Sequence, residues 1–328
     1  MNINSYSSVV LGGSTFGWSS GAAESMRILD FFASYGGHVI DTSDFYSEWV
    51  PGNQGGESES ILGQWMKKNN KRREIEVITK VGMLSTRQGF SASNIYAASE
   101  DSLRRLKTDY IDVYMPHRTP KCDEVEGFIE AFSKLFKSGK ILSVGFSHCN
   151  FRDLKKIAME LGNQNVPIKY VEDNFNLLER ENFESTIPWT VSNEIEFIAA
   201  RGLAGGFLTG KYKGLQKNHY IRIMSGQLLH FLSSGSKAIR KGYRSSLTSA
   251  SVASYLKLDW DNLFNVLEQI ARERQTTVAS VVLSWTLSQV GVSKTCVSFR
   301  TCRQLKSTRI FNLDYEEITK INDVLEKV

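Results

Sequence analysis

The stretch that decides the fold is NIYAASEDSLRRLKTDYIDVYMPH, residues 94–117. Its first half places apolar residues at the spacing of an amphipathic helix, near 3.6 residues per turn. Its second half, DYIDVYMPH, is short and rich in β-branched and aromatic residues, which is typical of a buried strand. A helix that leads directly into a strand is the repeating unit of parallel α/β proteins.

The same alternation continues in both directions along the chain. Strands are predicted at residues 9–13, 38–43, 76–80, 109–117, 141–147, 169–176, 196–202 and 295–300. The clearest helical patterns lie at residues 24–35, 59–68, 94–106, 125–139, 260–274, 279–289 and 314–328. Gly139 is expected to end the helix that begins at residue 125, because glycine favours the position just after a helix.

Eight strand–helix units in 328 residues, without a break in composition, favour one closed (β/α)8 TIM barrel over residues 1–328. A doubly wound open sheet is the alternative. Such a sheet usually carries G-x-G-x-x-G after its first strand, whereas this chain has LGGSTFG. Residues 212–258 are long, basic and serine-rich, and they predict a variable loop or insertion after the seventh strand.

Composition narrows the class of protein. Hydrophobic residues make up 41% and charged residues 23%, which predicts a globular chain with a sizeable core. The start, MNINSYSSVVLGG, lacks the features of an export signal, and no run of about 18 apolar residues occurs. We therefore expect a cytoplasmic protein that does not associate with membranes. The four cysteines have neither C-x-x-C nor zinc-site spacing, so we expect reduced thiols and no metal.

The net charge of +5 is unevenly distributed. No acidic residue lies between Glu196 and Asp259, whereas Lys and Arg recur throughout that interval. A basic segment of this kind suits an anionic ligand, a nucleic acid or a membrane surface, and it equally suits a solvated loop. We expect no nucleic-acid partner, and a steep salt dependence of DNA affinity would argue for one.

Titratable residues stand at the ends of several predicted strands. In a TIM barrel the carboxyl ends of all strands meet at one face, which carries the active site. The residues at or just beyond these ends are Asp41, Tyr46, Lys80, His117, Ser147 and His148. Each alone is equally consistent with a solvated strand end, but together they predict one site. Asp44 is expected to be a loop or capping residue.

These residue types suit the protonation of a carbonyl oxygen as hydride reaches its carbon. Tyrosine has a pKa of about 10 and is a weak acid at neutral pH. A nearby Lys80 is expected to favour the phenolate and make Tyr46 a better proton donor, while Asp41 pairs with Lys80. His117 is expected to hydrogen-bond the carbonyl oxygen. Acyl transfer fits poorly, because no nucleophile stands beside a base.

The chain resembles the aldo-keto reductase superfamily over nearly all of its length, and the segment YSEWVPGNQGGESE resembles its bacterial branch near the potassium-channel β subunits. The matching stretches, in order, are IDTSDFY, GGESESILGQWM, VITKVG, SLRRLKTDYIDVYMPH, GKILSVGFS, NFNLLER, GGFLTGKY and VVLSWTLSQVGV. The resemblance implies an NADPH-dependent reductase of aldehydes or ketones, with NADH as the alternative cofactor. It also implies a catalytic tetrad of Asp41, Tyr46, Lys80 and His117, in which Tyr46 is the general acid.

The resemblance further implies residues for the cofactor and the substrate. The cofactor set is Thr15, Phe16, Asp41, Ser147, His148, Glu172, Leu203, Gly205, Lys211, Arg300 and Gln304. The substrate pocket is implied at Trp18 and Trp49. From its position after His117, Arg118 is expected to bind an anionic group of the substrate, with a solvated loop residue as the alternative. Several positions depart from the family pattern: Glu172 replaces a glutamine, His148 an asparagine, Ala200 a stacking aromatic, Thr308 an asparagine, and Val297-Ser298 a Pro-Gly pair.

These departures leave two alternatives open. One is a reductase-like binding or regulatory protein without useful turnover. The other is a redox-neutral biosynthetic enzyme that keeps its cofactor tightly bound. The sequence predicts neither the carbonyl substrate nor the oligomeric state.

Overall fold

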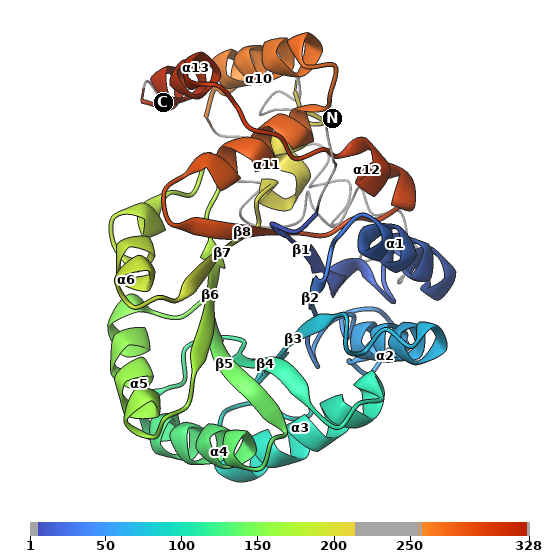
Figure 1. The fold of residues 1–328 in the computed structure, drawn as a ribbon, viewed down its shortest axis with the longest axis vertical. Coiled ribbons are helices and arrows are strands. Elements are labelled where there is room, and N and C mark those ends of the chain that lie inside the picture. The colour runs from blue at the N-terminus through green and yellow to red at the C-terminus, as the bar shows by residue number, and fades with distance from the viewer. Residues whose placement is uncertain (1–5, 214–254, 256–257, 327–328) are drawn as a thin grey trace, which may run out of the picture.

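Eight parallel strands close into a barrel in the order of the sequence, as Figure 1 shows from one end. The computed structural model describes residues 6–213, 255 and 258–326. The strands are β1 (Val9–Gly12), β2 (Val39–Asp41), β3 (Glu76–Val81), β4 (Ile111–Pro116), β5 (Ile141–Ser147), β6 (Ile168–Asn174), β7 (Glu196–Ala200) and β8 (Val292–Val297). The predicted (β/α)8 barrel is confirmed, and the open sheet is excluded.

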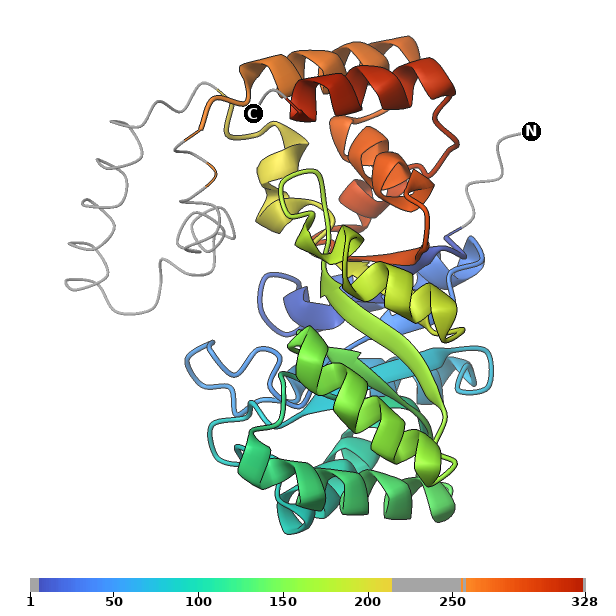
Figure 2. The same ribbon diagram turned by 90° about the vertical axis from the view of Figure 1, so that its left-hand side faces the viewer.

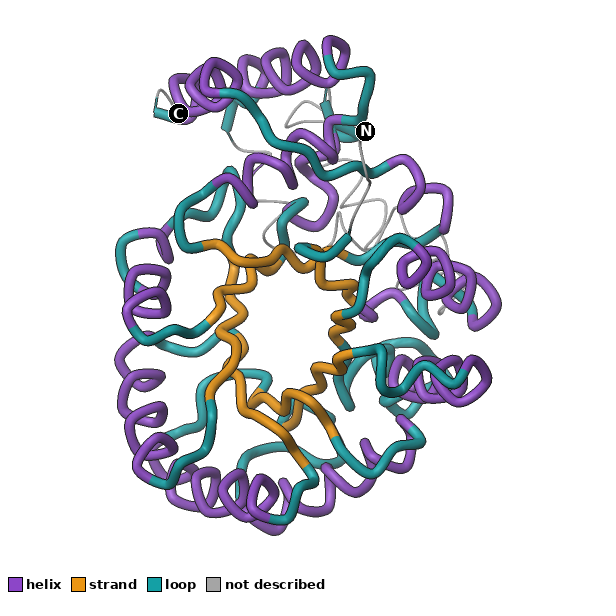
Figure 3. Tube along the Cα trace, in the orientation of Figure 1, coloured by secondary structure: helices purple, strands orange, loops and turns teal. Residues whose placement is uncertain are grey.

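Helices surround the barrel on its outside (Figure 3). They are α1 (Ala22–Ser34), α2 (Glu57–Asn69), α3 (Ala92–Leu106), α4 (Val125–Lys137), α5 (Phe151–Asn163), α6 (Thr186–Ser192), α10 (Asp261–Glu273), α11 (Val278–Ser288), α12 (Cys302–Ser307) and α13 (Tyr315–Leu325). Helices α10 and α13 lie side by side beyond the ring, as Figures 1 and 2 both show. Helices α5, α6 and α12 were not among the clearest helical patterns of the sequence.

Two predicted boundaries can be compared with the structure in detail. Gly139 follows the end of α4 with φ of 73°, a left-handed conformation that glycine adopts without strain, so its predicted role is confirmed. Strand β8 was predicted at 295–300 but begins at Val292. The early residues were missed because they are polar. Lys294 forms an ion pair with Glu196 at 2.9 Å, so a charged residue is accommodated within the strand.

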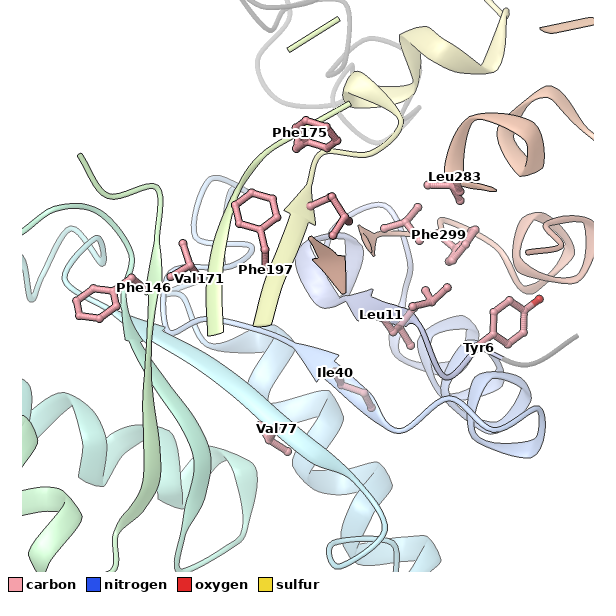
Figure 4. Close-up of a cluster of buried hydrophobic side chains, with 14 of the residues drawn as sticks. Tyr6, Leu11, Ile40, Val77, Phe146, Val171, Phe175, Phe197, Leu283 and Phe299 are labelled. Atoms are coloured by element: carbon pink, nitrogen blue, oxygen red, sulfur yellow. The ribbon is translucent and has the colours of Figure 1, made fainter. Parts of the chain in front are cut away.

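The strand period of two residues separates the inside of the barrel from the outside. Outward side chains such as Leu11, Ile40 and Val77 join the large cluster between strands and helices (Figure 4). A second apolar cluster, formed by alternate strand residues, consists of Val10, Val39, Ile78, Val113, Met115, Tyr170 and Ile198. Asp41, Lys80 and Glu172 each lie two residues beyond a member of this second cluster, so they face the same interior, closer to the carboxyl ends.

Two further features concern the surroundings of the barrel. None of the helices in the described ranges combines the length and apolarity needed to cross a bilayer. The variable loop predicted at residues 212–258 falls almost wholly outside the described residues.

Candidate active site

The centre of the site is the side chain of Lys80, which is fully buried on β3. Its ammonium donates a hydrogen bond to Asp41 Oδ1 on β2 and lies 3.6 Å from Glu172 Oε2 on β6. Both carboxylates are buried, with 1% and 4% of Asp41 and Glu172 exposed. One cation therefore faces two potential anions in a region from which water is excluded.

Burial and Glu172 raise the pKa of Asp41 to about 7, against the opposing effect of Lys80. Burial by itself lowers the pKa of Lys80, but Asp41 and Glu172 together raise it well above its ordinary value. Lys80 is therefore an ammonium at neutral pH. Asp41, Glu172 and Cys296 also bring possible metal ligands within 4.8 Å of one another, but Lys80 already provides the positive charge at that position.

Tyr46 lies beside this pair. Its hydroxyl donates to Asp41 Oδ2 at 3.0 Å and accepts from the Lys80 ammonium at 3.2 Å. The loop after β2 is fixed from both sides: the Asp44 N–H donates to the Lys80 carbonyl, and the Ser47 hydroxyl donates to the Phe16 carbonyl. The phenol is thus held in position by hydrogen bonds to side chains of two strands. The loop that carries the phenol is itself hydrogen-bonded to backbone carbonyl groups on both sides.

The acidity of Tyr46 differs from the expectation based on sequence. Burial, followed by the charge of Asp41, raises its pKa well above 10, and the ammonium of Lys80 opposes this only in part. Lys80 favours the phenolate as expected, but the net shift of the pKa is in the opposite direction, because sequence does not reveal how completely the hydroxyl is removed from water. Tyr46 keeps its proton across the physiological pH range.

His117 follows β4, and its backbone N–H donates to the Val81 carbonyl. Its ring lies 5.7 Å from the Tyr46 ring, and its Nδ1 is 3.0 Å from the Ser43 hydroxyl. Burial, Lys80 and His148 all lower the pKa of His117 well below its ordinary value. His117 is therefore a neutral imidazole with a single ring N–H.

A cavity of about 740 Å³ opens beside Tyr46. The predicted site residues that line it are Thr15, Trp18, Asp41, Tyr46, His148, Glu172, Leu203, Gly205, Lys211, Arg300 and Gln304. Lining residues that the sequence did not single out include Ser14, Thr209 and Cys296. Cys296 packs against the interior cluster of the barrel, which strand alternation alone did not reveal.

Six predicted residues do not line this cavity: Phe16, Lys80, His117, Ser147, Trp49 and Arg118. Lys80 and Ser147 are fully buried behind its wall, and Phe16 belongs to the core. Arg118 pairs with Glu124 at 3.4 Å, and its guanidinium lies 4.8 Å from the Phe90 ring centroid.

The two tryptophans form an aromatic wall near Tyr46. Trp18 lines the cavity, and Trp49 meets it edge to face with ring centroids 5.5 Å apart. Trp49 also lies 5.3 Å from the Phe45 ring and 6.5 Å from the Tyr46 ring. This wall offers an apolar surface next to the phenol.

Polar atoms without hydrogen-bond partners gather around the cavity. Within the described part of the chain they include Trp18 Nε1, Ser147 Oγ and Glu172 Oε2, all buried. Buried polar groups in folded proteins are nearly always paired, so each unpaired group calls for an explanation. Because Trp18 and Glu172 line the cavity, and Ser147 lies opposite Glu172 in the strand register, a polar ligand explains them together.

Two cations line the same cavity farther from Tyr46. Burial and the charge of Arg300 lower the pKa of Lys211 to about 8. Within the described ranges, no carboxylate forms an ion pair with Lys211 or Arg300, although Lys211 lies over the Tyr212 ring. Gly206 leaves room for the ammonium, because a Cβ there would lie 2.8 Å from Lys211 Nζ. Two neighbouring cations of this kind suit phosphate groups.

Comparison with known proteins decides the family. The model of the aldo/keto reductase family matches residues 8–326. The chain belongs to the aldo/keto reductase family. Members of this family carry out carbonyl oxidoreduction with a nicotinamide cofactor.

Three relatives show the range of similarity of this aldo/keto reductase. The chain is 32% identical to aldo-keto reductase YhdN of Bacillus subtilis over 177 residues, which cover 53% of this chain and half of YhdN. It is 26% identical to the uncharacterized oxidoreductase YrpG of the same organism, over 97% of this chain and 92% of YrpG. It is 25% identical to protein Tas of Escherichia coli, over 98% of this chain and 93% of Tas.

The residues around the cavity fit a nicotinamide dinucleotide. Lys211 and Arg300 match the charge of its phosphates, while Glu172, which lines the cavity, and Ser147, which lies opposite it in the strand register, offer oxygens without hydrogen-bond partners for an amide. The cavity volume lies within the range of about 300–1,000 Å³ that is usual for small-molecule sites.

Proposed function

We propose that this aldo/keto reductase reduces an aldehyde or ketone to an alcohol with NADPH, and that Tyr46 is the general acid. The observation that carries the proposal is the position of the Tyr46 hydroxyl. It contacts both Asp41 and Lys80 and borders a cavity that also holds two phosphate-compatible cations.

Each residue of the tetrad has a separate task in this proposal. Tyr46 donates its proton to the carbonyl oxygen, and the bound nicotinamide supplies hydride to the carbonyl carbon. Lys80 stabilises the tyrosinate that remains, because its ammonium lies 3.2 Å from that oxygen. Asp41 compensates the charge of the buried Lys80 ammonium. His117 orients the carbonyl oxygen toward Tyr46.

The preference for NADPH rests on the unpaired cations. NADPH carries one phosphate more than NADH, so a site in which neither Lys211 nor Arg300 has a carboxylate partner among the described residues favours the more highly charged cofactor. The aromatic wall of Trp18 and Trp49 favours binding of a carbonyl substrate that carries an apolar or aromatic substituent.

The test combines binding with turnover. NADPH is titrated into the protein with tryptophan fluorescence as the signal, and NADPH oxidation is then followed with a panel of aliphatic and aromatic aldehydes and ketones. The proposal expects saturable binding with a micromolar Kd and turnover of at least one carbonyl class. Absence of binding at millimolar NADPH, with protein shown to be folded by circular dichroism, contradicts it.

One observation favours a second candidate function, a redox-neutral reaction with a retained cofactor. Glu172 is a second buried carboxylate beside Lys80, whose ammonium also contacts the phenol of Tyr46. An oxidised nicotinamide is a cation, so a carboxylate nearby stabilises that form over the neutral reduced form. Oxidised cofactor that copurifies with the protein, and turnover without net consumption of NADPH, support this alternative. A reductase-like binding protein instead predicts binding without either reaction.

A further inference from the structure

The hydroxyl of Ser43 lies between Asp44 and the ring of His117. Its Oγ is 3.0 Å from His117 Nδ1 and 3.3 Å from Asp44 Oδ1. The backbone N–H of Phe45 donates to the same oxygen at 3.1 Å. Three polar groups therefore share one hydroxyl, which has one proton to donate and two lone pairs to accept.

When all three contacts of Ser43 are hydrogen bonds, counting donors leaves two arrangements. The N–H of Phe45 takes one lone pair of Ser43, so one proton and one lone pair remain for Asp44 and His117. Whenever Ser43 donates to one of these two groups, the other must donate to Ser43. The protonation state of Asp44 thus determines which nitrogen of His117 carries hydrogen.

In the first arrangement Asp44 is ionised and can only accept. Ser43 then donates to Asp44, and the N–H of His117 is at Nδ1, directed at Ser43, which leaves Nε2 as an acceptor. In the second arrangement Asp44 is a neutral acid and donates to Ser43. Ser43 then donates to Nδ1, and His117 carries its hydrogen at Nε2, on the side of the ring away from Ser43.

The surroundings of Asp44 favour the neutral acid. Its side chain is 1% exposed, and its Oδ2 has no hydrogen-bond partner in the described structure. The charged groups that face it are Glu59 of α2 and Arg105 of α3, which pair with each other at 2.6 Å; Tyr114 of β4 also faces it. Burial, followed by Glu59, raises the pKa of Asp44 to about 8.

Double protonation of the His117 ring does not add a third arrangement. Burial, the ammonium of Lys80 on β3 and His148 after β5 all lower the pKa of His117. The ring therefore holds a single proton, as the two arrangements require.

We propose that Asp44, acting through Ser43, is a positioning residue that holds His117 in the tautomer with hydrogen at Nε2. In this tautomer His117 is a hydrogen-bond donor for a ligand beside Tyr46, and it becomes an acceptor when Asp44 loses its proton. The tautomer itself follows from the contacts of Ser43 together with the burial of Asp44, and it does not depend on a ligand. Its use in orienting a carbonyl oxygen rests on the proposed function.

The switch has a consequence for catalysis that separates Asp44 from Tyr46. Carbonyl reduction requires a donor at His117 and falls as Asp44 ionises, so kcat/KM for reduction declines above about pH 8. Tyr46 does not cause this decline, because its pKa lies well above 10. Oxidation of an alcohol passes through the same transition state, so kcat/KM for oxidation requires the same tautomer of His117.

The direct test is nitrogen NMR of the cofactor-free protein labelled with ¹⁵N-histidine, since the two tautomers of imidazole have distinct ring-nitrogen shifts. Spectra are recorded at about pH 6 and about pH 10, two units on either side of the pKa of Asp44. The His117 signals are assigned with His117→Gln. The expected result is the Nε2–H tautomer at the lower pH and the Nδ1–H tautomer at the higher pH.

Two variants and one control keep the test decisive. Asp44→Asn places an amide donor beside Ser43 and is expected to hold Nε2–H at both pH values and to remove the alkaline decline in kcat/KM. Ser43→Ala breaks the connection, so its tautomer ceases to follow pH. Asp323→Asn, an exposed aspartate on α13, is expected to switch like the wild type.

The proposal is overturned if the wild-type protein shows Nδ1–H at the lower pH, if its tautomer does not change between the two pH values, or if Asp44→Asn still switches. Because the NMR measurement needs neither cofactor nor substrate, its failure is distinguishable from failure of the proposed function. A normal tautomer switch in a protein that reduces no carbonyl contradicts the proposed function alone.

Discussion

The two sides of the cavity differ in how their polar groups are paired. On the side of Tyr46, the phenol, Asp41 and Lys80 satisfy one another, and the loop that carries the phenol is tied to neighbouring strands. On the other side, Ser147 Oγ lacks a hydrogen-bond partner, Glu172 Oε2 has only the Lys80 ammonium at 3.6 Å, and Lys211 and Arg300 form no ion pair with a described carboxylate.

This difference indicates what each side does. A paired, buried group of charges is already in its working geometry, because donors and acceptors fixed before the reaction need no reorganisation during it. Unpaired polar atoms around a cavity lower the stability of the free protein. Binding of a ligand that pairs with these atoms restores that stability. We therefore regard the Tyr46 side as the preformed chemical centre and the Lys211 side as the binding site.

The largest effect on activity is expected from a variant that removes a reacting group of the preformed side. Tyr46→Phe removes the proton donor while keeping the ring, so kcat/KM for carbonyl reduction should fall about 10²–10⁴-fold. The Kd for NADPH, measured by fluorescence titration, should change by less than about twofold, because no cofactor-binding cation is altered. Activity within tenfold of the wild type would show that the phenol is not the acid.

The next effect comes from the binding side. Lys211→Met should weaken NADPH binding about 10–100-fold, since a charge-assisted hydrogen bond contributes about 1.5–3 kcal/mol. Lys213→Met is the matched control: Lys213 lies two residues away but pairs with Glu268 at 2.9 Å, so its loss should leave the Kd unchanged. Equal weakening by both variants would contradict a specific role for Lys211.

The binding side also predicts a pH dependence. Because the pKa of Lys211 is lowered to about 8, the ammonium is lost in the free protein as pH rises through that value. NADPH affinity should be constant below about pH 8 and fall by up to about tenfold per unit above it, as binding then requires proton uptake. Calorimetric titration over this range measures the slope, and a flat profile in the wild type would contradict the assignment.

A smaller effect links the two sides through Glu172. Glu172→Gln removes one negative charge beside Lys80 and should weaken NADP⁺ relative to NADPH by about tenfold, the size of an interaction of about 1.4 kcal/mol. The ratio of the two Kd values measures this directly, with the exposed Glu181→Gln as control. An unchanged ratio would place the nicotinamide away from Glu172.

The smallest effect concerns stability. The pKa of Asp44 is about 8 in the folded protein and about 3.9 for an unperturbed aspartate, so the folded state binds more protons between these values. The free energy of unfolding therefore falls as pH rises from about 4 to about 8. Asp44→Asn should abolish this loss and stabilise the protein by at least about 1 kcal/mol at pH 8, with little change at pH 4. Denaturant titrations of the variant and of Asp323→Asn provide the comparison.

The sequence predicted the preformed side better than the binding side, for a physical reason. Strand periodicity places Asp41 and Lys80 inside the barrel, and chain order brings adjacent strand ends together, so their proximity could be anticipated. The contact between Ser43 and His117 joins loops 74 residues apart, and no periodicity specifies which loop side chains meet.

Electrostatics were the least predictable property. Residue types alone suggested that Lys80 lowers the pKa of Tyr46, whereas complete burial and Asp41 outweigh it. From the sequence, Asp44 was likewise expected to be an ordinary loop residue. Only its burial against Glu59 and Tyr114 shows that this acid keeps its proton. The degree of burial is a property of the folded chain and is absent from local sequence.

The most direct test of the division between a preformed side and a binding side is a crystal structure with bound NADP⁺. The account predicts phosphates within hydrogen-bonding distance of Lys211 and Arg300, and the nicotinamide amide paired with Ser147 or Glu172. It also predicts that Asp41, Tyr46 and Lys80 move by less than about 1 Å. A cofactor bound elsewhere, or a rearranged Tyr46–Lys80 pair, would contradict it.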